Sequence, residues 1–291
     1  MFAFIERQAG AHSTEKMANI LGVSRSGYYR YHKKLLSQRR QDDLFYSERI
    51  KHLFVLSRET YGCDRMQQAL AGESITLGKR RIIRLMKEAY LIPKKRRFFK
   101  KTTVVDSRLP VADNQLAQQF EASQPNEKWV SDISYIFTKE GWLYIAAILD
   151  LFSRKLIGLA MDNHLRTELV ARALKQALKH RQHPQELLHH SDRGCQYTSH
   201  EFQALLRQHG ITCSMSGKGN CYDNAAMESF FATLKTECVY FENFQTREEA
   251  ELKIFDYCEI FYNNQRAHST LGYLSPKAIE EQYYNSEKPV H

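Results

Sequence analysis

The sequence lacks any long hydrophobic run. Its longest apolar stretch, residues 142–149, ends at Asp150 and is far shorter than the roughly 18 residues that a membrane-spanning helix needs. The first residues, MFAFIERQAG, also lack the basic region and the apolar region of a secretory signal peptide. We therefore expect a soluble, cytoplasmic protein with no membrane anchor.

Cysteine patterns of the structural kinds are absent as well. The six cysteines form no CxxC pair and show no dense spacing, which disfavours a disulfide framework and a zinc knuckle and leaves reduced thiols. With 43% hydrophobic and 26% charged residues, the composition is that of a globular protein and excludes wholesale disorder. A length of 291 residues allows two domains.

Charge is divided unevenly along the chain. Residues 1–110 hold 24 Lys or Arg and 10 Asp or Glu, a net charge of +14, whereas residues 111–291 have a net charge of −5. A segment with such an excess of cations is suited to the phosphate backbone of nucleic acid, because neutralised phosphates release condensed counterions. An ordinary solvated basic surface is the alternative.

The first hundred residues are typical of helices joined by short turns. Ser13 can cap a helix that Gly22 ends, and Ser24 can cap a second helix that carries Arg25 and Arg30. A helix, a glycine turn and a basic helix form a plausible helix-turn-helix for DNA.

A second unit of this type follows. Apolar residues recur at helical spacing before Gly72 and again from Ile82 to Ala89. The outward face of the later helix is predicted to carry four cations, Lys79, Arg80, Arg81 and Arg84. A small helical bundle with a solvated face is the alternative for both units, and we interpret residues 1–92 as a helical DNA-binding region.

Residues 93–125 lack periodicity and are interpreted as a basic linker. The linker contains the run KKRRFFKK at 94–101, whose candidate phosphate contacts are Lys94, Lys95, Arg96 and Arg97. The adjacent Phe98 and Phe99 suit base stacking, although a hydrophobic clamp onto a domain would use them equally well.

After residue 126 the pattern changes to strands and then to alternation of helices with strands. Strands are predicted at 129–138, 142–151, 155–161, 186–191 and 211–216, and helices at 167–180, 199–209, from 224, at 247–262 and after 276. This order predicts an α/β fold of the ribonuclease-H-like type, a mixed sheet flanked by helices, for the core at 126–291.

Three acidic residues fall where such a sheet places chemistry. Asp132 lies on the first strand, Asp192 ends the fourth, and Glu228 lies near the start of a helix behind a glycine-rich stretch. Hard Mg²⁺ prefers carboxylate oxygens, and two such ions about 3.5–4 Å apart can activate an attacking oxygen and stabilise a leaving one.

The spacing of Asp192 and Glu228 does not by itself single out this pair. Four Asp and Glu pairs have thirty-five intervening residues: Asp132/Glu168, Asp150/Glu186, Asp192/Glu228 and Asp223/Glu259. Context favours the third pair, because it joins a strand end to a helix start.

Five ordered motifs then carry a resemblance. They are WVSDISYI (129–136), LDLFSRKLIG (149–158), HHSDRGCQY (189–197), SMSGKGNCYDNAAMESFFATLK (214–235) and YNNQRAHSTLGYLSP (262–276). Together they resemble the catalytic core of bacterial transposases of the insertion-sequence-3 family, which are relatives of retroviral integrases. The segments LGVSRSGYYRY (21–31) and 61–93 resemble the helical N-terminal part of that family.

The resemblance implies a function and a site. Asp132, Asp192 and Glu228 would be the metal-binding catalytic triad, with Mg²⁺ as the cofactor and Mn²⁺ as a substitute. Lys235 matches a basic residue of the family, and its offset of about 700° on a helix places it on the same face as Glu228, where it can contact phosphate. The implied partners are element-end and target double-stranded DNA, with a homo-oligomer assembled on DNA in the bacterial nucleoid.

Other residues near the triad have structural interpretations. We interpret Asp150 as part of a strand-ending turn, although it could be a fourth acid near the metals. Adjacent His189 and His190 point to opposite faces of a strand, so zinc binding by them together with Cys195 is not expected.

Two interpretations remain open for the motif residues that precede the predicted helix at 224. Asn220, Tyr222, Asp223 and Asn224 can order the loop near the DNA end, cap the helix, or do both. Arg266 and His268 belong to a motif for which a structural turn and a DNA contact are both open.

Two features of the relatives are absent. Only Cys63 precedes residue 195, so the zinc module of retroviral integrases is missing, and no leucine heptad is sustained. The chain therefore resembles the downstream product of its element, which acts after fusion to an upstream-frame product in this family.

The main hypothesis is a metal-dependent transposase that cleaves at an element end and joins the freed 3′-OH to another phosphodiester. An accessory DNA-binding or regulatory product without activity of its own is the alternative. A structure-selective nuclease that cleaves without joining is a third hypothesis.

Overall fold

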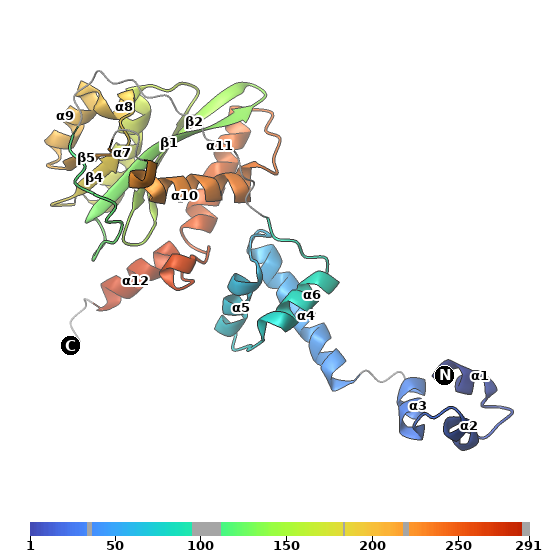
Figure 1. Ribbon diagram of the computed structural model, residues 1–291. Helices are drawn as coiled ribbons and strands as arrows, with labels where there is room; N and C mark the ends of the chain where they lie inside the picture. Colours follow the sequence, from blue (N-terminus) through green and yellow to red (C-terminus); the bar gives the residue numbers. More distant parts are fainter. Residues whose placement is uncertain (34–36, 95–111, 183, 218–220, 287–291) are drawn as a thin grey trace.

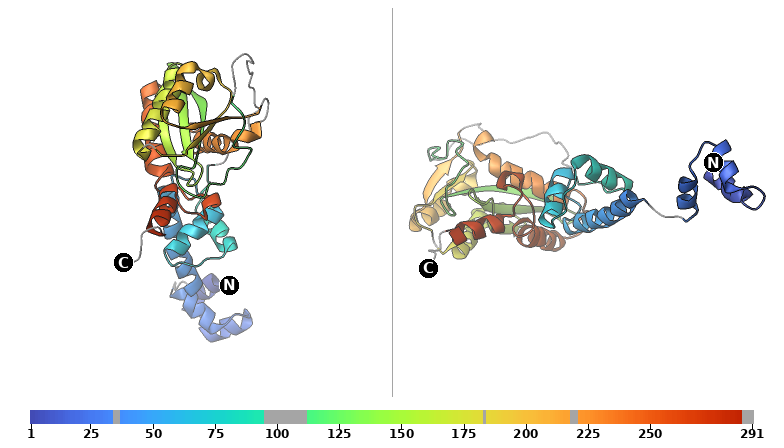
Figure 2. Two further views of the ribbon diagram at one scale, coloured as in Figure 1. Left: turned by 90° about the vertical axis from the view of Figure 1, so that its left-hand side faces the viewer. Right: turned by 90° about the horizontal axis from the view of Figure 1, so that it is seen from below.

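The computed structural model describes residues 1–33, 37–94, 112–182, 184–217 and 221–286. Three parts follow one another along the chain: a small helical lobe, a second group of helices, and a sheet covered by helices (Figure 1). The views in Figure 2 show the small lobe at one end of an elongated molecule and the sheet at the other. In the described part, no helix is long and apolar enough to cross a membrane.

The small lobe contains α1 (Phe2–Gln8), α2 (Thr14–Ile20) and α3 (Arg25–His32). These helices pack around Ile5, Met17, Ala18 and Tyr28. The turn between α2 and α3 forms as the sequence predicts: Gly22 adopts a positive φ of 64°, and the Ser24 hydroxyl accepts a hydrogen bond of 3.1 Å from the Gly27 amide. Helix α1 has no counterpart in the sequence prediction.

The second group consists of α4 (Gln38–Leu56), α5 (Cys63–Gly72) and α6 (Lys79–Glu88). Its core contains Ile50, Met66, Leu70, Ile82 and Leu85. Helix α4 was not predicted individually, although it is the longest of the three. The helices α5 and α6 match the second predicted unit, and α5 ends at the glycine expected to interrupt it.

The core sheet has five strands in the order β3-β2-β1-β4-β5. They are β1 (Lys128–Thr138), β2 (Gly141–Asp150), β3 (Leu156–Asp162), β4 (Leu188–Ser191) and β5 (Thr212–Met215). The first three are an antiparallel meander, and β4 and β5 run parallel to β1 and to each other. The predicted mixed sheet of the ribonuclease-H-like type is therefore confirmed.

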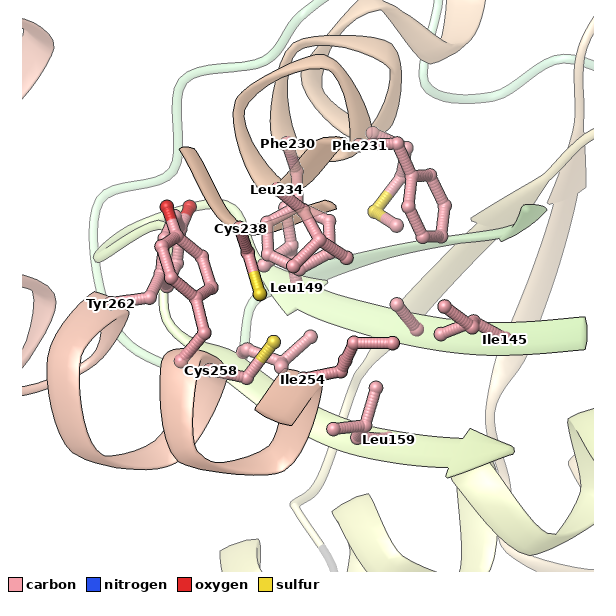
Figure 3. Packing of buried hydrophobic residues seen from close by; sticks show 14 of the residues in the cluster. Ile145, Leu149, Leu159, Phe230, Phe231, Leu234, Cys238, Ile254, Cys258 and Tyr262 are labelled. Atoms are coloured by element: carbon pink, nitrogen blue, oxygen red, sulfur yellow. The ribbon is translucent and has the colours of Figure 1, made fainter. Parts of the chain in front are cut away.

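Helices cover both faces of the sheet (Figure 1). One face carries α7 (Thr167–Arg181), α8 (Cys195–Thr198) and α9 (His200–Gln208). The other carries α10 (Ala225–Leu234) and α11 (Arg247–Phe255), each continued by a π-helical turn, η2 (Lys235–Val239) and η3 (Asp256–Tyr262). Figure 3 shows Phe230 and Leu234 of α10 packed over Leu149 of β2. Helix α12 (Pro276–Ser286) ends the described chain.

Residues 112–125, which belong to the segment interpreted as a linker, contain no helix or strand. They nevertheless lie against the core, because Leu116 is buried in it and the amides of Gln115 and Leu116 donate to the Ser214 hydroxyl. The first position of predicted strand 186–191 is displaced: Glu186 has a positive φ of 55°, and β4 begins only at Leu188.

Candidate active site

The register of the sheet brings Asp132 and Asp192 side by side. The parallel strands β1 and β4 pair Lys128 with Leu188 and Val130 with His190. Asp132 lies two residues beyond the last of these pairs on β1, and Asp192 directly follows β4, close enough for its charge to raise the pKa of Asp132. A pairing between distant segments therefore creates the acidic pair.

Backbone amides orient the two aspartates. The Asp132 carboxylate accepts a hydrogen bond of 2.8 Å from the Ile133 amide, and the Asp192 carboxylate accepts one of 2.9 Å from the Gly194 amide. A Cβ atom at Gly194 would lie 3.0 Å from the Asp192 carboxylate oxygen, closer than ordinary van der Waals contact. Glycine at this position allows the tight turn that holds Asp192.

Glu228 and Lys235 reach the acidic pair from α10. Glu228 lies in the first turn of this helix, and Lys235 continues it two turns later. The start of the helix is fixed to β1 because the Asn224 side-chain amide donates a hydrogen bond of 3.1 Å to the Ser131 carbonyl. The Lys235 ammonium lies 5.2 Å from the ring centroid of Tyr135, an exposed aromatic on β1 that the sequence did not single out.

The charges of these four side chains affect one another. Burial above all, together with the negative charges of Asp192 and Glu228, raises the pKa of Asp132 to about 8, although the Ile133 hydrogen bond and Lys235 oppose the rise. Burial also raises the pKa of Asp192. The pKa of Lys235 is lowered by burial, while Asp132 raises it. The carboxylates thus form one electrostatic group that a cation would stabilise.

The geometry sets a limit on how a metal can be held. In the described part of the chain, no group of three His, Cys, Asp or Glu side chains is arranged to hold a single ion. The donors are all hard carboxylate oxygens, which suit Mg²⁺.

The loop before α10 is organised by Asp223. Its buried carboxylate accepts hydrogen bonds from the Gly217 amide at 2.7 Å and from the side-chain amides of Asn114 and Gln118 at 2.8 and 3.1 Å. Asp223 therefore ties the loop and the segment before β1 together. Of the other loop residues named in the sequence analysis, Asn220 and the Tyr222 side chain lie outside the described residues.

Asp150 belongs to a different cluster. Its carboxylate accepts hydrogen bonds from the amides of Asn126 and Phe152, and it lies 3.7 Å from Arg181 of α7. Burial raises the pKa of Asp150 to about 6, which Arg181 opposes. Asp150 closes the end of β2, in agreement with the turn interpretation.

The two adjacent histidines are buried and neutral. Burial lowers the pKa of His189 to about 3 and that of His190 to about 4. His190 bonds to the hydroxyls of Ser214 and Ser216 on the neighbouring strand segment, and Cys195 is exposed. These contacts are structural.

The candidate DNA-binding cations of the helical parts differ in their surroundings. Arg25 pairs with Glu15 and Lys79 with Asp64 at exposed positions, and Arg30 and Arg80 are exposed. Arg81 and Arg84 are only half-exposed.

Arg81 and Arg84 depart from the outward face that the sequence predicted. Both donate to the carboxylate of Asp43 on α4, at 2.8 and 2.7 Å. They turn toward α4 because Asp43 has little exposed surface and requires cationic partners. Lys94 lies 5.7 Å from the Phe241 ring, whereas Lys95, Arg96 and Arg97 lie outside the described residues.

Arg266 and His268 form part of the core. The guanidinium of Arg266 donates to both carboxylate oxygens of Glu237, at 2.8 and 2.7 Å, and also contacts the His268 ring. Glu237 also accepts a hydrogen bond of 2.8 Å from the Tyr257 hydroxyl. Nothing in the local sequence indicates Glu237 as the partner of this motif.

Comparison with known proteins gives matches over most of the chain. Residues 122–221 and 228–286 each match a family model described as integrase core domain, and residues 40–99 match an HTH-like domain. The HTH-like match covers α4–α6 and leaves the small lobe outside it.

Two curated relatives align with this chain over nearly their whole length. The uncharacterized 31 kDa protein of insertion element IS600 from Shigella sonnei is 45% identical over 268 residues, which are 92% of this chain and 98% of the relative. The transposase InsF for insertion sequence IS3A from Escherichia coli strain K12 is 38% identical over 281 residues, which are 96% of this chain and 98% of the relative. Among solved structures, a chain of the simian T-cell lymphotropic virus intasome in complex with PP2A regulatory subunit B56 gamma aligns with a TM-score of 0.48 and 16% identity, covering 77% of this chain and 71% of that chain.

An integrase core preceded by an HTH-like domain defines a DNA-binding polynucleotidyl transferase. The full-length matches narrow this class. The chain belongs to the IS3 family of insertion-sequence transposases, as its motifs indicated.

Proposed function

We propose that this IS3-family transposase cleaves a phosphodiester at the end of its element and joins the freed 3′-OH to target DNA, with Asp132, Asp192 and Glu228 as the catalytic carboxylates. The observation that supports the proposal is the pairing of β1 with β4, together with the effect of the charges of Asp192 and Glu228 on the pKa of Asp132. A transposase function that depends on two aspartates and a glutamate, the DDE triad, agrees with the family.

The chemistry consists of two displacements at phosphorus. In the first, a water oxygen attacks the phosphate and the bond to the 3′ oxygen breaks, which leaves a 3′-OH. In the second, that 3′-OH attacks a target phosphodiester, and a target 3′-OH leaves. Mg²⁺, with Mn²⁺ as a substitute, would supply charge neutralisation and activation of the attacking oxygen.

The protein side chains position the metal ions and the DNA, and none of them acts as a nucleophile. Asp132 and Asp192 would hold the metal ions, and Glu228 would complete their coordination. The amides of Ile133 and Gly194 fix the orientation of the two aspartates before any ligand binds. Lys235 would contact a DNA phosphate beside Glu228, because its ammonium already lies near Asp132.

We propose further that the basic helical region, 1–92, and the linker, 93–125, hold the terminal inverted repeats. The exposed Arg25, Arg30, Lys79 and Arg80 suit phosphate contacts, and Arg81 and Arg84 would take part only through their exposed portions. Lys94 to Arg97 would extend the contact along the linker. The active form would be a homo-oligomer on DNA, with an upstream-frame product as fusion or partner.

Strand transfer of labelled element-end oligonucleotides tests the proposal. The wild type and Glu228→Gln are compared with Mg²⁺ or Mn²⁺, each as this chain alone and as a fusion to the upstream frame. Joined product from the wild type that disappears in Glu228→Gln is the expected result. Binding without joining by every form would favour the accessory function, and cleavage without joining would favour the nuclease.

A further inference from the structure

A cavity of about 330 Å³ lies beside α10, the helix that carries Glu228. Its walls come from α5, from the turn after β2, from α10 and from the segment 266–270. Three arginines line it, Arg65, Arg154 and Arg266. No Asp or Glu is among the described residues that line this arginine cavity.

Among the described residues, Arg65 and Arg266 share a single carboxylate, that of Glu237. Glu237 accepts two hydrogen bonds from Arg266, and the Arg65 guanidinium lies 3.4 Å from the same carboxylate. The side chains of Arg266 and Glu237 are 6% and 7% exposed, so this cluster is almost completely removed from water. One negative charge between two guanidiniums leaves an excess positive charge beside the cavity.

Arg154 adds a third cation without a partner of opposite charge. In the described part of the chain it forms no ion pair, although burial lowers the pKa of its guanidinium. Its backbone is held at a positive φ of 58°, and the Tyr262 hydroxyl donates a hydrogen bond of 3.2 Å to its carbonyl. The turn thus presents to the cavity an arginine that no carboxylate of the described residues neutralises, which favours an external anion.

The positive charge of the three arginines also affects the pKa of His268. Burial, together with the charges of Arg266, Arg65 and Arg154, lowers the pKa of His268 to about 2. The histidine is therefore neutral and adds no charge of its own.

The position of the cavity beside α10 indicates which anion it would bind, a phosphate of the DNA backbone. On α10, Ala225, Ser229 and Thr233 line the cavity, and successive residues of a helix are turned by about 100°. Ser229 therefore follows Glu228 by about a quarter of a turn. Because the cavity shares α10 with Glu228, a DNA strand whose reacting phosphate lies at Glu228 would bring a neighbouring phosphate to the cavity.

We propose that the arginine cavity binds a backbone phosphate of the DNA strand next to the reacting phosphodiester, with Arg154 as its main contact. This inference rests on the proposed function. It also gives a common role to the motifs at 149–158 and 262–276, whose arginines meet here from segments more than a hundred residues apart.

The test compares Arg154→Gln with Arg207→Gln. Arg207 is exposed in the last turn of α9. Its replacement by Gln removes the same charge at a position outside the cavity. Binding to a fluorescent duplex is measured over a series of salt concentrations. We expect Arg154→Gln to bind about tenfold more weakly and to reduce the slope of log K against log salt by about one, whereas Arg207→Gln leaves both unchanged.

Further variants keep the test decisive. Thr233→Glu places a negative charge in the cavity and should weaken binding as well, and Arg154→Lys should retain most of the slope. Equal slopes for the wild type, Arg154→Gln and Thr233→Glu would overturn the site but leave the proposed function intact. A wild type that binds no DNA would overturn both.

Inorganic pyrophosphate distinguishes a free phosphate from a DNA phosphate. If pyrophosphate raises the melting temperature of the wild type and not of Arg154→Gln, while duplex binding is equal in both, the cavity takes a free phosphate and the proposal is wrong. Loss of duplex binding and salt slope in Arg154→Gln is the result that supports it.

Discussion

The buried pair of Glu237 and Arg266 gives a large and specific prediction. Replacing Glu237 by Gln keeps the shape of the side chain but leaves Arg266, 6% exposed, without its carboxylate. Breaking a buried ion pair on one side costs about 3–5 kcal/mol, because the remaining charge stays desolvated. For a protein of this size, we expect the melting temperature of Glu237→Gln to fall by roughly 10 °C.

The dependence on pH follows from the pKa of Glu237. Burial raises this pKa, but the hydrogen bonds and charge of Arg266 and then the charge of Arg65 outweigh burial and leave the pKa below its usual value. A carboxyl with a lowered pKa in the folded state contributes stability above its unfolded pKa, and the contribution is lost as the pH falls through the folded pKa. The difference between the wild type and Glu237→Gln should therefore shrink in acid.

Urea denaturation followed by circular dichroism measures this effect. Glu281→Gln is the control, because Glu281 pairs with Lys277 across 3.7 Å on the surface, where such pairs contribute about 1 kcal/mol or less. The double variant Glu237→Gln with Arg266→Met should recover much of the loss, since it removes the unpaired charge. A cost below about 1 kcal/mol for Glu237→Gln alone would refute the reasoning.

Three further predictions concern the metal site and the core. Added Mg²⁺ should raise the melting temperature of the wild type and leave that of Asp192→Asn unchanged; an equal rise in both would remove Asp192 from the site. Because the pKa of Asp132 is raised to about 8, the metal-free protein should lose stability as the pH rises from about 4 to 8. For the same reason, binding of Mg²⁺ near pH 7 should release about one proton, which calorimetry in two buffers of different ionisation enthalpy measures. Gly158→Ala should cost about 1–3 kcal/mol in urea denaturation, because its Cβ would overlap the Ala173 carbonyl, whereas Gly10→Ala, which has open space, should be nearly neutral.

The elements with strong periodicity were predictable from the sequence. Strands β1 to β3 and helix α7 lie within one or two residues of the predicted ranges, because α7 has an apolar stripe at helical spacing and the strands are β-rich runs bounded by turn residues. Helix α4 was missed for the opposite reason. Its apolar residues are scattered around the helix, with Phe45 and Val55 exposed and Asp43 buried, so no single apolar face indicates it.

The candidate site was predictable only in part. The end of a strand and the start of a helix suggested Asp192 and Glu228, but the pairing of β1 with β4 depends on tertiary contacts that no local pattern encodes. The same holds for Arg65 and Arg266, which reach Glu237 from positions that are 172 and 29 residues away in the chain. Long-range ion pairs of this kind leave no spacing to detect.

The measurement that tests the central claim most directly is metal-dependent rescue of Asp192→Cys in the strand-transfer assay. If Asp192 holds the catalytic metal, the thiolate should fail with hard Mg²⁺ and regain joined product with the softer Mn²⁺, while end binding is unchanged. Full activity of Asp192→Cys with Mg²⁺, or equal inactivity with both ions despite normal end binding, would contradict the assignment.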